Sequence, residues 1–336
     1  MNTNGKPVAS LSLDLDNQWS YMKTHGDPAW ESLPSYLDIV VPRVLGFLAE
    51  RGLKITFFIV GQDAALSRNR PALAAITAAG HEVGNHSFRH EPWLHLYTDD
   101  EVEAEIARAE AAILESTGQR PIGFRGPGFS ISTTVLTTLK RRGYRYDAST
   151  FPTFLGPLAR AYYFFTAKLE KEQREQRKEL FGGVREGFRP LRPYHWRLGA
   201  GPLLELPVTT MPIFRLPFHA SYLIYLAGFS PALARLYFAT ALTLCRWTGV
   251  QPSLLLHPLD FLGVDDGIEP LKFFPGMNIP SKMKLAWLDG FIAAFRRRFE
   301  VVPMGAHVDA LQATARLPVV DPVFASEVAG ATPAAT

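Results

Sequence analysis

The chain has 336 residues, of which 47% are hydrophobic, and carries a formal net charge of +3. This length can bury one large hydrophobic core or two modest ones. The small net charge, with no basic run interleaved with aromatic residues, argues against a nucleic-acid partner. The single cysteine, Cys245, excludes an intrachain disulfide and is typical of proteins in a reducing compartment.

The two ends of the chain bear on its location and on its domain bounds. Residues 1–7 are polar and lead directly into an apolar stretch, with no apolar signal region before it. We therefore expect a cytoplasmic protein without an ordinary cleaved leader. Residues 321–336 are rich in Ala, Pro and Val, which predicts a disordered tail.

Predicted strands and helices alternate through the first half of the chain. Residues 35–51 place apolar side chains on one helical face, and Gly52 follows their end. A cap-like Thr98-Asp99-Asp100-Glu101 opens another helix. In chain order the pattern predicts strand 8–13, helix 35–51, strand 55–60, helix 71–79, strand 82–85, helix 98–117, strand 122–125, helix 133–142 and strand 144–147.

The second half continues the alternation less regularly. Strands are predicted at 203–209, 253–257 and 301–303, with a helix at 283–299 before the last. The order predicts parallel strands with helical crossovers, so the expected fold class is α/β, an irregular (β/α) barrel. We expect a single domain over residues 1–320. Two features interrupt it: a helical insertion at about 152–202 and an apolar helical segment at about 211–250.

Two short segments supply the parts of a hydrolytic metal site. Asp14-Leu15-Asp16 follows the first strand, and residues two apart on an extended segment share a face, so both carboxylates can point the same way. His86 and His90 are four apart, which brings their imidazoles together on one turn or tight loop. One carboxylate and two imidazoles suit zinc or a similar metal with open positions for water and substrate. The second carboxylate is then free to act as a base.

Each segment also has a simpler interpretation when it stands alone. An Asp-x-Asp at a strand end occurs in nucleotide-sugar sites of glycosyltransferases, and more often as solvated loop acids. A His-x-x-x-His pair arises by chance in many chains. The surroundings favour a site, because residues 79–85 predict a helix end and a short strand before the histidines. Enzymes of the α/β class place their catalytic residues in loops at the ends of buried parallel strands.

Three further polar residues fall at predicted strand ends. Arg125 stands beside a rigid Gly126-Pro127-Gly128 turn and could clamp a carboxylate bidentately, although a surface arginine on a turn is an equally good interpretation. Asp147 ends the strand at 144–147. His257 directly follows three leucines and fits either a structural residue or a catalytic acid.

Taken in order, these five segments resemble the polysaccharide deacetylases of carbohydrate esterase family four. The family pattern is an acid pair, a His-x-x-x-His, an Arg-x-Pro, an acid at a strand end and a Leu-x-x-His; the resemblance spans residues 8–260. The Asp-x-Asp spacing resembles the subgroup with bacterial peptidoglycan deacetylases and the deformylase of lipid-linked formamido-arabinose. The family's usual aromatic residue after the fourth acid is absent, and Phe151 is the candidate for its place.

The resemblance implies a metal site and a base. Asp16, His86 and His90 would bind a divalent metal, expected to be Zn²⁺. Asp14 would be the general base that deprotonates the attacking water. The deacetylase type of (β/α) barrel is the fold that this resemblance implies.

The resemblance also implies an acid and two supporting residues. His257 would be the general acid that protonates the departing amine, with Asp147 orienting its imidazole. Arg125 would hold Asp14 charged and orient it. A base and an acid on opposite sides of the reacting carbonyl each contribute roughly 10²–10⁴-fold to the rate.

The segments around the fifth motif are unusual for their composition. The insertion holds an aromatic stretch at 158–165 and a charged run at 168–180, the latter typical of a solvated helix. Residues 206–259 contain no Asp or Glu. Prolines and a glycine interrupt the uncharged residues 216–234, so two short helices at about 220–227 and 231–247 are expected rather than a spanning helix. These helices either cover the barrel core or form an interfacial surface for anionic headgroups.

We therefore expect a metal-dependent hydrolase that removes an N-acetyl group from an amino sugar. The absent leader and the apolar segment favour a lipid-linked or nucleotide-linked precursor as partner, with peripheral contact to the inner face of the membrane. A non-sugar C–N amidase with the same site is an alternative. From other classes, a glycosyltransferase using Asp14-Leu15-Asp16 would leave the three histidines without roles, and an inactive glycan- or lipid-binding barrel would not need all five motifs.

Overall fold

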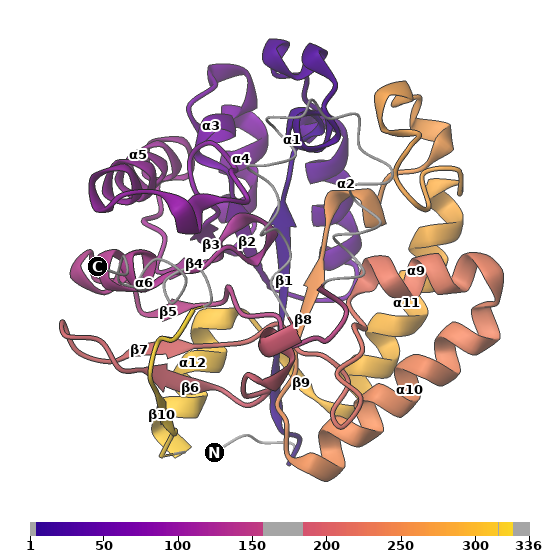
Figure 1. The fold of residues 1–336 in the computed structure, drawn as a ribbon. Helices are drawn as coiled ribbons and strands as arrows, with labels where there is room; N and C mark the ends of the chain where they lie inside the picture. Colours follow the sequence, from indigo (N-terminus) through magenta and orange to yellow (C-terminus); the bar gives the residue numbers. More distant parts are fainter. Residues whose placement is uncertain (1–4, 157–183, 315, 325–336) are drawn as a thin grey trace, which may run out of the picture.

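The structure is a computed structural model that describes residues 5–156, 184–314 and 316–324. Its strands form one 10-stranded sheet, and the helices lie around the outside of it (Figure 1). The strands are β1 (Val8–Leu15), β2 (Thr56–Ile59), β3 (Glu82–Asn85), β4 (Gly123–Phe124), β5 (Tyr146–Asp147), β6 (Tyr194–Trp196), β7 (Leu203–Glu205), β8 (Ser253–Leu256), β9 (Glu300–Val302) and β10 (Val319–Val320).

The sheet curls into an irregular barrel. Its strand order is β10-β6-β7-β5-β4-β3-β2-β1-β8, with β9 pairing to β1, and all pairs are parallel except β6 with β7. The chain after β7 returns to β8, because Thr209 N donates to Ser253 O at 3.1 Å and Ser253 N donates to Thr209 Oγ1 at 2.8 Å. The prediction of an irregular (β/α) barrel is confirmed.

The helices form where apolar faces and caps occur in the sequence. Val40, Val44 and Leu48 are fully buried on one face of α2. The predicted capping box of Thr98 and Glu101 opens α5. The helices are α1 (Gln18–His25), α2 (Leu37–Ala49), α3 (Gly61–Ala64), α4 (Arg70–Ala78), α5 (Asp99–Thr117), α6 (Thr133–Arg141), α9 (Ala220–Phe229), α10 (Pro231–Thr248), α11 (Ser281–Arg298) and α12 (Met304–Thr314).

One end of the barrel is closed by α12. Met304 N donates to Thr56 Oγ1 at 2.8 Å, at the residue where β2 begins. Met304, Val308 and Leu311 pack with Phe58 and other side chains of the barrel interior. Polar residues that follow the carboxyl ends of the strands therefore gather at the opposite end.

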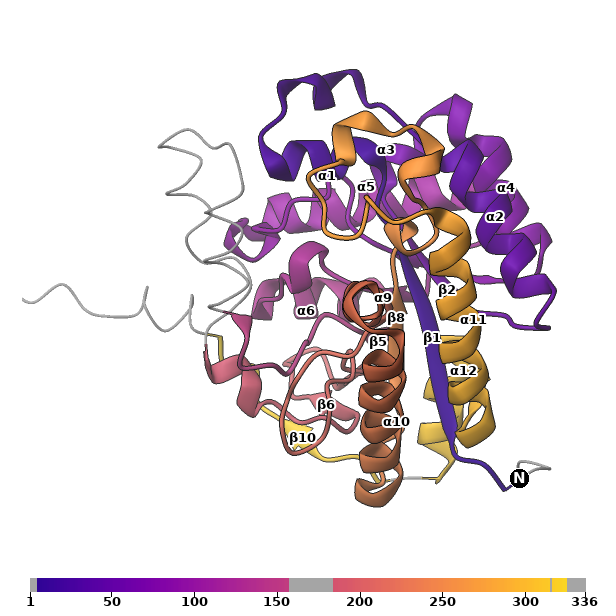
Figure 2. The same cartoon turned by 90° about the vertical axis from the view of Figure 1, so that its right-hand side faces the viewer.

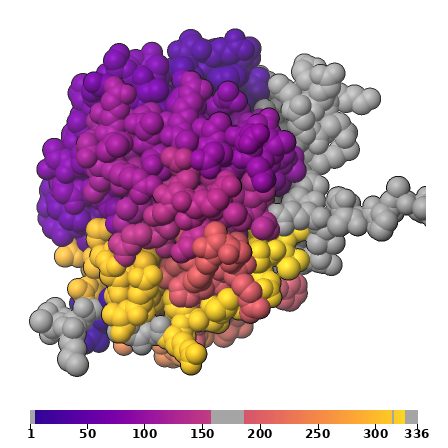
Figure 3. Space-filling model, turned by 90° about the vertical axis from the view of Figure 1, so that its left-hand side faces the viewer, coloured from indigo at the N-terminus to yellow at the C-terminus, as the bar shows by residue number. Residues whose placement is uncertain are grey.

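The apolar segment near residues 211–250 forms α9 and α10, as predicted, on the outer surface of the molecule (Figure 2). Within the described residues no helix is long and apolar enough to cross a bilayer. The aromatic stretch 158–165 and the charged run 168–180 lie outside the described residues. Figure 3 shows the opposite side of the molecule, where residues near 100–150 (purple to magenta) lie beside residues near 300–324 (yellow).

The predicted tail begins too early. Phe324 is only 4% exposed, and its ring centroid lies 5.6 Å from that of Trp196 on β6. This buried aromatic contact extends the folded part of the chain past residue 320. The other proposed domain bounds stay predictions.

Candidate metal centre and its surroundings

The end of β1 carries two carboxylates on one side of the chain. Asp14 and Asp16 flank Leu15, which is 1% exposed in the apolar core, and the alternation of an extended strand turns both acids the other way. Asn17 follows at once and caps α1, with its side chain accepting from Gln18 N at 2.8 Å. The strand therefore ends at Leu15, and Asp16 is the one residue between β1 and the Asn17 cap.

The loop after β3 presents the two histidines. Asn85 ends the strand, and its Oδ1 accepts from Ser87 N at 2.9 Å. Ser87 Oγ in turn accepts from His90 N at 3.1 Å. Ser87 and His90 both have positive φ, 59° and 55°, a backbone conformation that non-glycine residues seldom adopt. A tight, internally bonded loop thus brings His86 and His90 to one place.

Asp16, His86 and His90 converge. Asp16 Oδ1 lies 3.3 Å from His86 Nε2 and 3.0 Å from His90 Nε2. One ligand atom from each residue lies within 4.8 Å of the other two. The predicted trio therefore has the donor set and the spacing of a site for one metal ion, with no fourth protein ligand among the described residues.

Hydrogen bonding and charge prepare these three residues. His86 Nδ1 lies 2.6 Å from Arg125 O, so a backbone carbonyl holds the ring with Nε2 towards Asp16. Burial raises the pKa of Asp16, but His90 and His86 outweigh it and hold that pKa well below its ordinary value. Burial lowers the pKa of His86, but Asp14 and Asp16 outweigh it and raise that pKa. A buried carboxylate that stays charged beside two imidazoles fits a cation held among them.

Asp14 has a different partner. Its Oδ1 accepts from Arg125 Nη1 at 2.6 Å, and the same nitrogen donates to Ser12 Oγ at 2.9 Å. Arg125 is 0% exposed, and its Nε donates to Ala148 O at 3.0 Å. The predicted contact between Arg125 and Asp14 is confirmed. The guanidinium also contacts Met304 Sδ through Nη2 at 3.6 Å, and it holds one carboxylate oxygen of Asp14.

His257 lies at the end of β8 and belongs to a short hydrogen-bonded chain. Its Nδ1 lies 3.2 Å from Ser221 Oγ, and Ser221 Oγ donates to Asp260 Oδ1 at 2.7 Å. Asp260 Oδ2 accepts from His257 N at 2.8 Å, so one carboxylate holds both the backbone and the partner of the imidazole. The sequence did not assign a role to Asp260, although it lies three residues after His257.

The prediction that Asp147 orients His257 is wrong. The Asp147 carboxylate accepts from Ser149 N at 3.1 Å and from Ser149 Oγ at 2.7 Å, and it makes no hydrogen bond to His257 in the described structure. Asp147 is paired in register with Glu205, and burial raises the pKa of both carboxyl groups. Tyr146 packs in the barrel interior, so the alternation of β5 turns Asp147 to the other side of the sheet.

Asp147 instead supports the loop that carries Arg125. Ser149 Oγ, which donates to Asp147, accepts from Gly126 N at 2.8 Å. A Cβ at Gly126 would lie 2.0 Å from Ser130 O, so only glycine fits this close approach of two backbone segments. Asp147 is thus linked through Ser149 to the residue that follows Arg125.

Two residues near the site were not predicted from the sequence. Asp63 follows β2, and its Oδ1 accepts from Asn17 Nδ2 at 2.6 Å and from Trp19 Nε1 at 2.9 Å. His219 precedes α9, and its ring centroid lies 5.5 Å from that of His257. Asp63 was detectable as another acid at a strand end.

An aromatic wall borders this end of the barrel. Phe151 stacks on Phe129 with centroids 4.6 Å apart, and it lies 5.7 Å from the His219 ring. Burial, with smaller contributions from the neighbouring His257 and Arg125, holds the pKa of His219 well below its ordinary value. The wall therefore presents apolar faces and a neutral imidazole.

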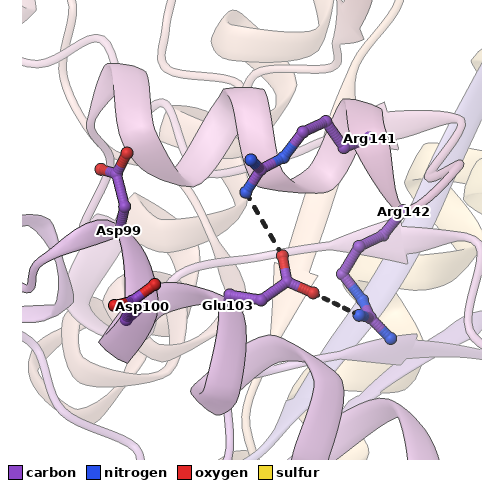
Figure 4. A pocket seen from close by; sticks show the side chains of 5 residues that line it. All are labelled: Asp99, Asp100, Glu103, Arg141 and Arg142. Carbon is purple, nitrogen blue, oxygen red and sulfur yellow. Dashed lines mark hydrogen bonds and ion pairs between the residues drawn. The ribbon is translucent and has the colours of Figure 1, made fainter.

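A surface pocket between α5 and α6 is a separate feature (Figure 4). It is lined by Asp99, Asp100, Glu103, Arg141 and Arg142. Glu103 pairs with both arginines, at 2.6 Å from Arg142 Nη1 and 3.4 Å from Arg141 Nη2. The pocket shares no residue with the histidine cluster, and both of its arginines are already paired, so we do not place the site there.

Comparison with known proteins points to one family. Residues 31–146 match the family model described as polysaccharide deacetylase. A peptidoglycan deacetylase-like protein of Gibberella zeae is 32% identical over 148 residues, which are 41% of this chain and 42% of that protein. A peptidoglycan-N-acetylglucosamine deacetylase of Bacillus cereus is 32% identical over 108 residues, 31% of this chain and 47% of that protein. The matched segments thus span less than half of these relatives.

One solved structure aligns with nearly the whole of this chain. A crystal structure of a Mycobacterium smegmatis protein assigned to the polysaccharide deacetylases aligns with a TM-score of 0.59 at 21% identity, over 95% of this chain and 94% of that one. At this identity the likeness shows a shared barrel fold.

Proposed function

We propose, from the premise that this chain carries a polysaccharide deacetylase domain, that it hydrolyses the amide bond of an N-acetylated amino sugar. One observation carries the proposal: Asp16, His86 and His90 converge beside the Asp14–Arg125 pair. The family match includes both histidines and Arg125, whereas Asp14 and Asp16 lie before it. The fold brings these separate stretches together, as a hydrolytic site requires.

The three convergent residues are proposed to hold a divalent metal, for which the donor set favours zinc. When bound, such an ion supplies Lewis-acid polarisation of a carbonyl and lowers the pKa of water from 15.7 to about 7. Asp16 contributes the negative charge, and the Arg125 carbonyl fixes the His86 ring through Nδ1.

Asp14 is proposed to take the proton of the attacking water. Arg125 Nη1 holds one of its carboxylate oxygens at 2.6 Å and so fixes the orientation of the acid. Since Asp14 is not used by the histidine cluster, its second oxygen is available to the water. The water oxygen then forms the new bond to the acyl carbon.

His257 is proposed to give a proton to the departing amine as the C–N bond breaks. Ser221 and Asp260 fix its ring from the Nδ1 side, which leaves Nε2 for the substrate. The products are acetate and a free amino sugar. The aromatic wall at Phe151 and Phe129 offers a flat apolar surface for a sugar ring.

For the substrate we propose an amino sugar carried on a lipid or a nucleotide. The support is local, since α9 begins directly after His219 and carries exposed aromatic side chains away from the site. The glycosyltransferase alternative is not favoured, because Asp14 and Asp16 are engaged by Arg125 and by two imidazoles rather than forming an open acid pair.

The test is release of acetate, with a matching amount of free amine, from N-acetylated substrates supplied with zinc. The panel comprises a chitooligosaccharide, a nucleotide-linked N-acetyl sugar and a lipid-linked one. A variant with His86→Ala and His90→Ala serves as the control and should be inactive on all three. If no member yields acetate above this control, the deacetylase proposal fails.

A further inference from the structure

An exposed apolar strip leads away from the His257 site along α9 and onto α10. It consists of Tyr222, Tyr225, Phe229, Leu233 and Leu236, whose exposed fractions lie between 40% and 72%. The α9 members are spaced to share one helical face. Tyr222 packs edge-on against His219 at 4.6 Å between centroids, and Tyr225 contacts Phe229 at 5.1 Å. The strip is therefore continuous on α9, from the neighbourhood of the site to the corner between the helices.

The same two helices are apolar on their inner faces. Leu223, Ile224, Ala234 and Phe238 are buried, and they belong to the main core. A surface helix usually presents polar side chains on its outer face. The inner faces of α9 and α10 already pack on the core, and their outer faces are apolar as well. Core packing therefore does not account for the strip.

A neighbouring loop adds two more exposed apolar residues. Ile213 and Phe214 are 69% and 57% exposed at the tip of the loop before α9. Ile213 has φ +72°, which is strained for a β-branched residue. The loop is tied to α10, since Tyr237 Oη donates to Pro217 O at 2.7 Å. The backbone thus holds a costly conformation while showing apolar side chains to solvent.

The charged side chains of the segment that forms the strip have one sign. Residues 206–259 contain no Asp and no Glu, and their only charged side chains apart from histidine are Arg215, Arg235 and Arg246. Arg235 and Arg246 are exposed on α10, and neither forms an ion pair with any residue in the described ranges. An apolar strip with unpaired arginines beside it complements an anionic lipid surface.

The same charges argue against a second copy of this chain as the occupant. A two-fold contact places the same patch on both subunits. Such a contact would bring the arginines of α10 together without an Asp or Glu on α9 or α10 to compensate them. Large contiguous apolar patches on soluble monomers commonly mark a binding surface.

We propose that the strip rests on an anionic lipid bilayer and so places the mouth of the His257 site at the membrane surface. This docking goes beyond the proposed hydrolysis and does not depend on it. Contact is peripheral, with the side chains of α9, α10 and the 213–214 loop tip entering the headgroup region.

Flotation with lipid vesicles tests the docking. Full-length protein should float with vesicles of phosphatidylcholine and phosphatidylglycerol, and much less with phosphatidylcholine alone or at high salt. The double variant Phe229→Ser/Leu236→Ser should bind anionic vesicles about tenfold more weakly, because it removes two large apolar side chains from the contact. Arg235→Glu/Arg246→Glu should lose the preference for anionic lipid.

Matched controls keep the test specific. Leu96 and Leu114 are 50% and 45% exposed outside the strip, so Leu96→Ser/Leu114→Ser should float like the wild type. Circular dichroism checks that each variant is folded, and turnover of a soluble N-acetylated substrate by the Phe229→Ser/Leu236→Ser variant should be unchanged. That readout separates failure of docking from failure of the proposed hydrolysis.

Three results would overturn the proposal. The first would be a wild type that fails to float with anionic vesicles. The second would be a control variant that loses as much binding as the strip variant. The third would be a dimer, seen by sedimentation, that the strip variant abolishes; it would assign the strip to contact between copies.

Discussion

Asp14 and Asp16 lie two residues apart on one strand end, yet their surroundings give them different chemistry. Asp16 lies within 3.3 Å of two imidazole nitrogens, whereas Asp14 is held by a fully buried guanidinium. A carboxylate shared with imidazoles is suited to ligation, and a carboxylate fixed by arginine keeps one oxygen for a proton. The two roles therefore follow from the partners rather than from the residue type.

Asp14→Asn tests this division. It should leave zinc binding nearly intact and lower kcat by about 10²–10⁴-fold, because it removes the base without removing a ligand. Asp16→Asn should lose zinc. Elemental analysis of the purified variants, alongside acetate release, measures both effects. Equal loss of zinc in the two variants would show that the roles are misassigned.

The hydrogen-bonded chain behind His257 makes a graded prediction. His257→Ala should depress kcat about 10²–10⁴-fold with little change in KM, since the proton is needed only as the C–N bond breaks. Ser221→Ala keeps the imidazole and removes only its Nδ1 partner, so its loss of kcat should be smaller. Steady-state kinetics on one soluble substrate compares them. A larger defect for Ser221→Ala than for His257→Ala would contradict the assignment.

The sequence identified the site residues that belong to a motif and lie at the end of a predicted strand. It could not predict contacts that depend on the direction in which a side chain points. Asp16, His86, His90 and the Asp14–Arg125 pair are brought together as predicted. Asp147 ends a strand as predicted, but Tyr146 beside it faces the barrel interior, so Asp147 faces the other side of the sheet. His219 belongs to no motif and reaches the site only because α9 begins there.

At the scale of elements, short polar segments between strands and helices determine where the ligands lie. Asn17 caps α1, and Asp63 on α3 bonds both Asn17 and Trp19, so α1 and α3 are joined beside Asp16. The sequence predicted the long helices and the buried strands, because their apolar periodicity is strong. It missed α1 and overextended the strand at 203–209, since these depend on caps and on contacts with distant strands.

Asp63 should make stability depend on pH. Burial raises its pKa from 3.8 to about 7, so the folded state binds the proton more tightly than the unfolded chain. Stability should therefore fall as the pH rises from about 4 through about 7. Asp63→Asn removes this titration, so its free energy of unfolding relative to that of the wild type should be higher at pH 8 than at pH 5. Urea unfolding with a chelator present measures the difference; an identical difference at both pH values would contradict the claim.

At the scale of the whole molecule, the barrel joins residues that are far apart in the chain. Asp14 lies on β1 and His257 at the end of β8, and these two strands are adjacent in the sheet. The loop with His86 and His90 follows β3, which is separated from β1 by β2. The Thr209–Ser253 contacts join the segment after β7 to β8, and α12 closes the opposite end of the barrel. The candidate site is thus a product of the complete barrel, and the alternation of elements in the sequence was enough to predict its class.

The central claim is that one metal ion held by Asp16, His86 and His90 is required for amide hydrolysis. The most direct measurement is a zinc titration of metal-free protein that records bound zinc and acetate release together. We predict that activity rises in proportion to bound zinc and saturates at one ion per chain. Full activity in the metal-free protein, or unchanged zinc binding after His86→Ala and His90→Ala, would contradict this account.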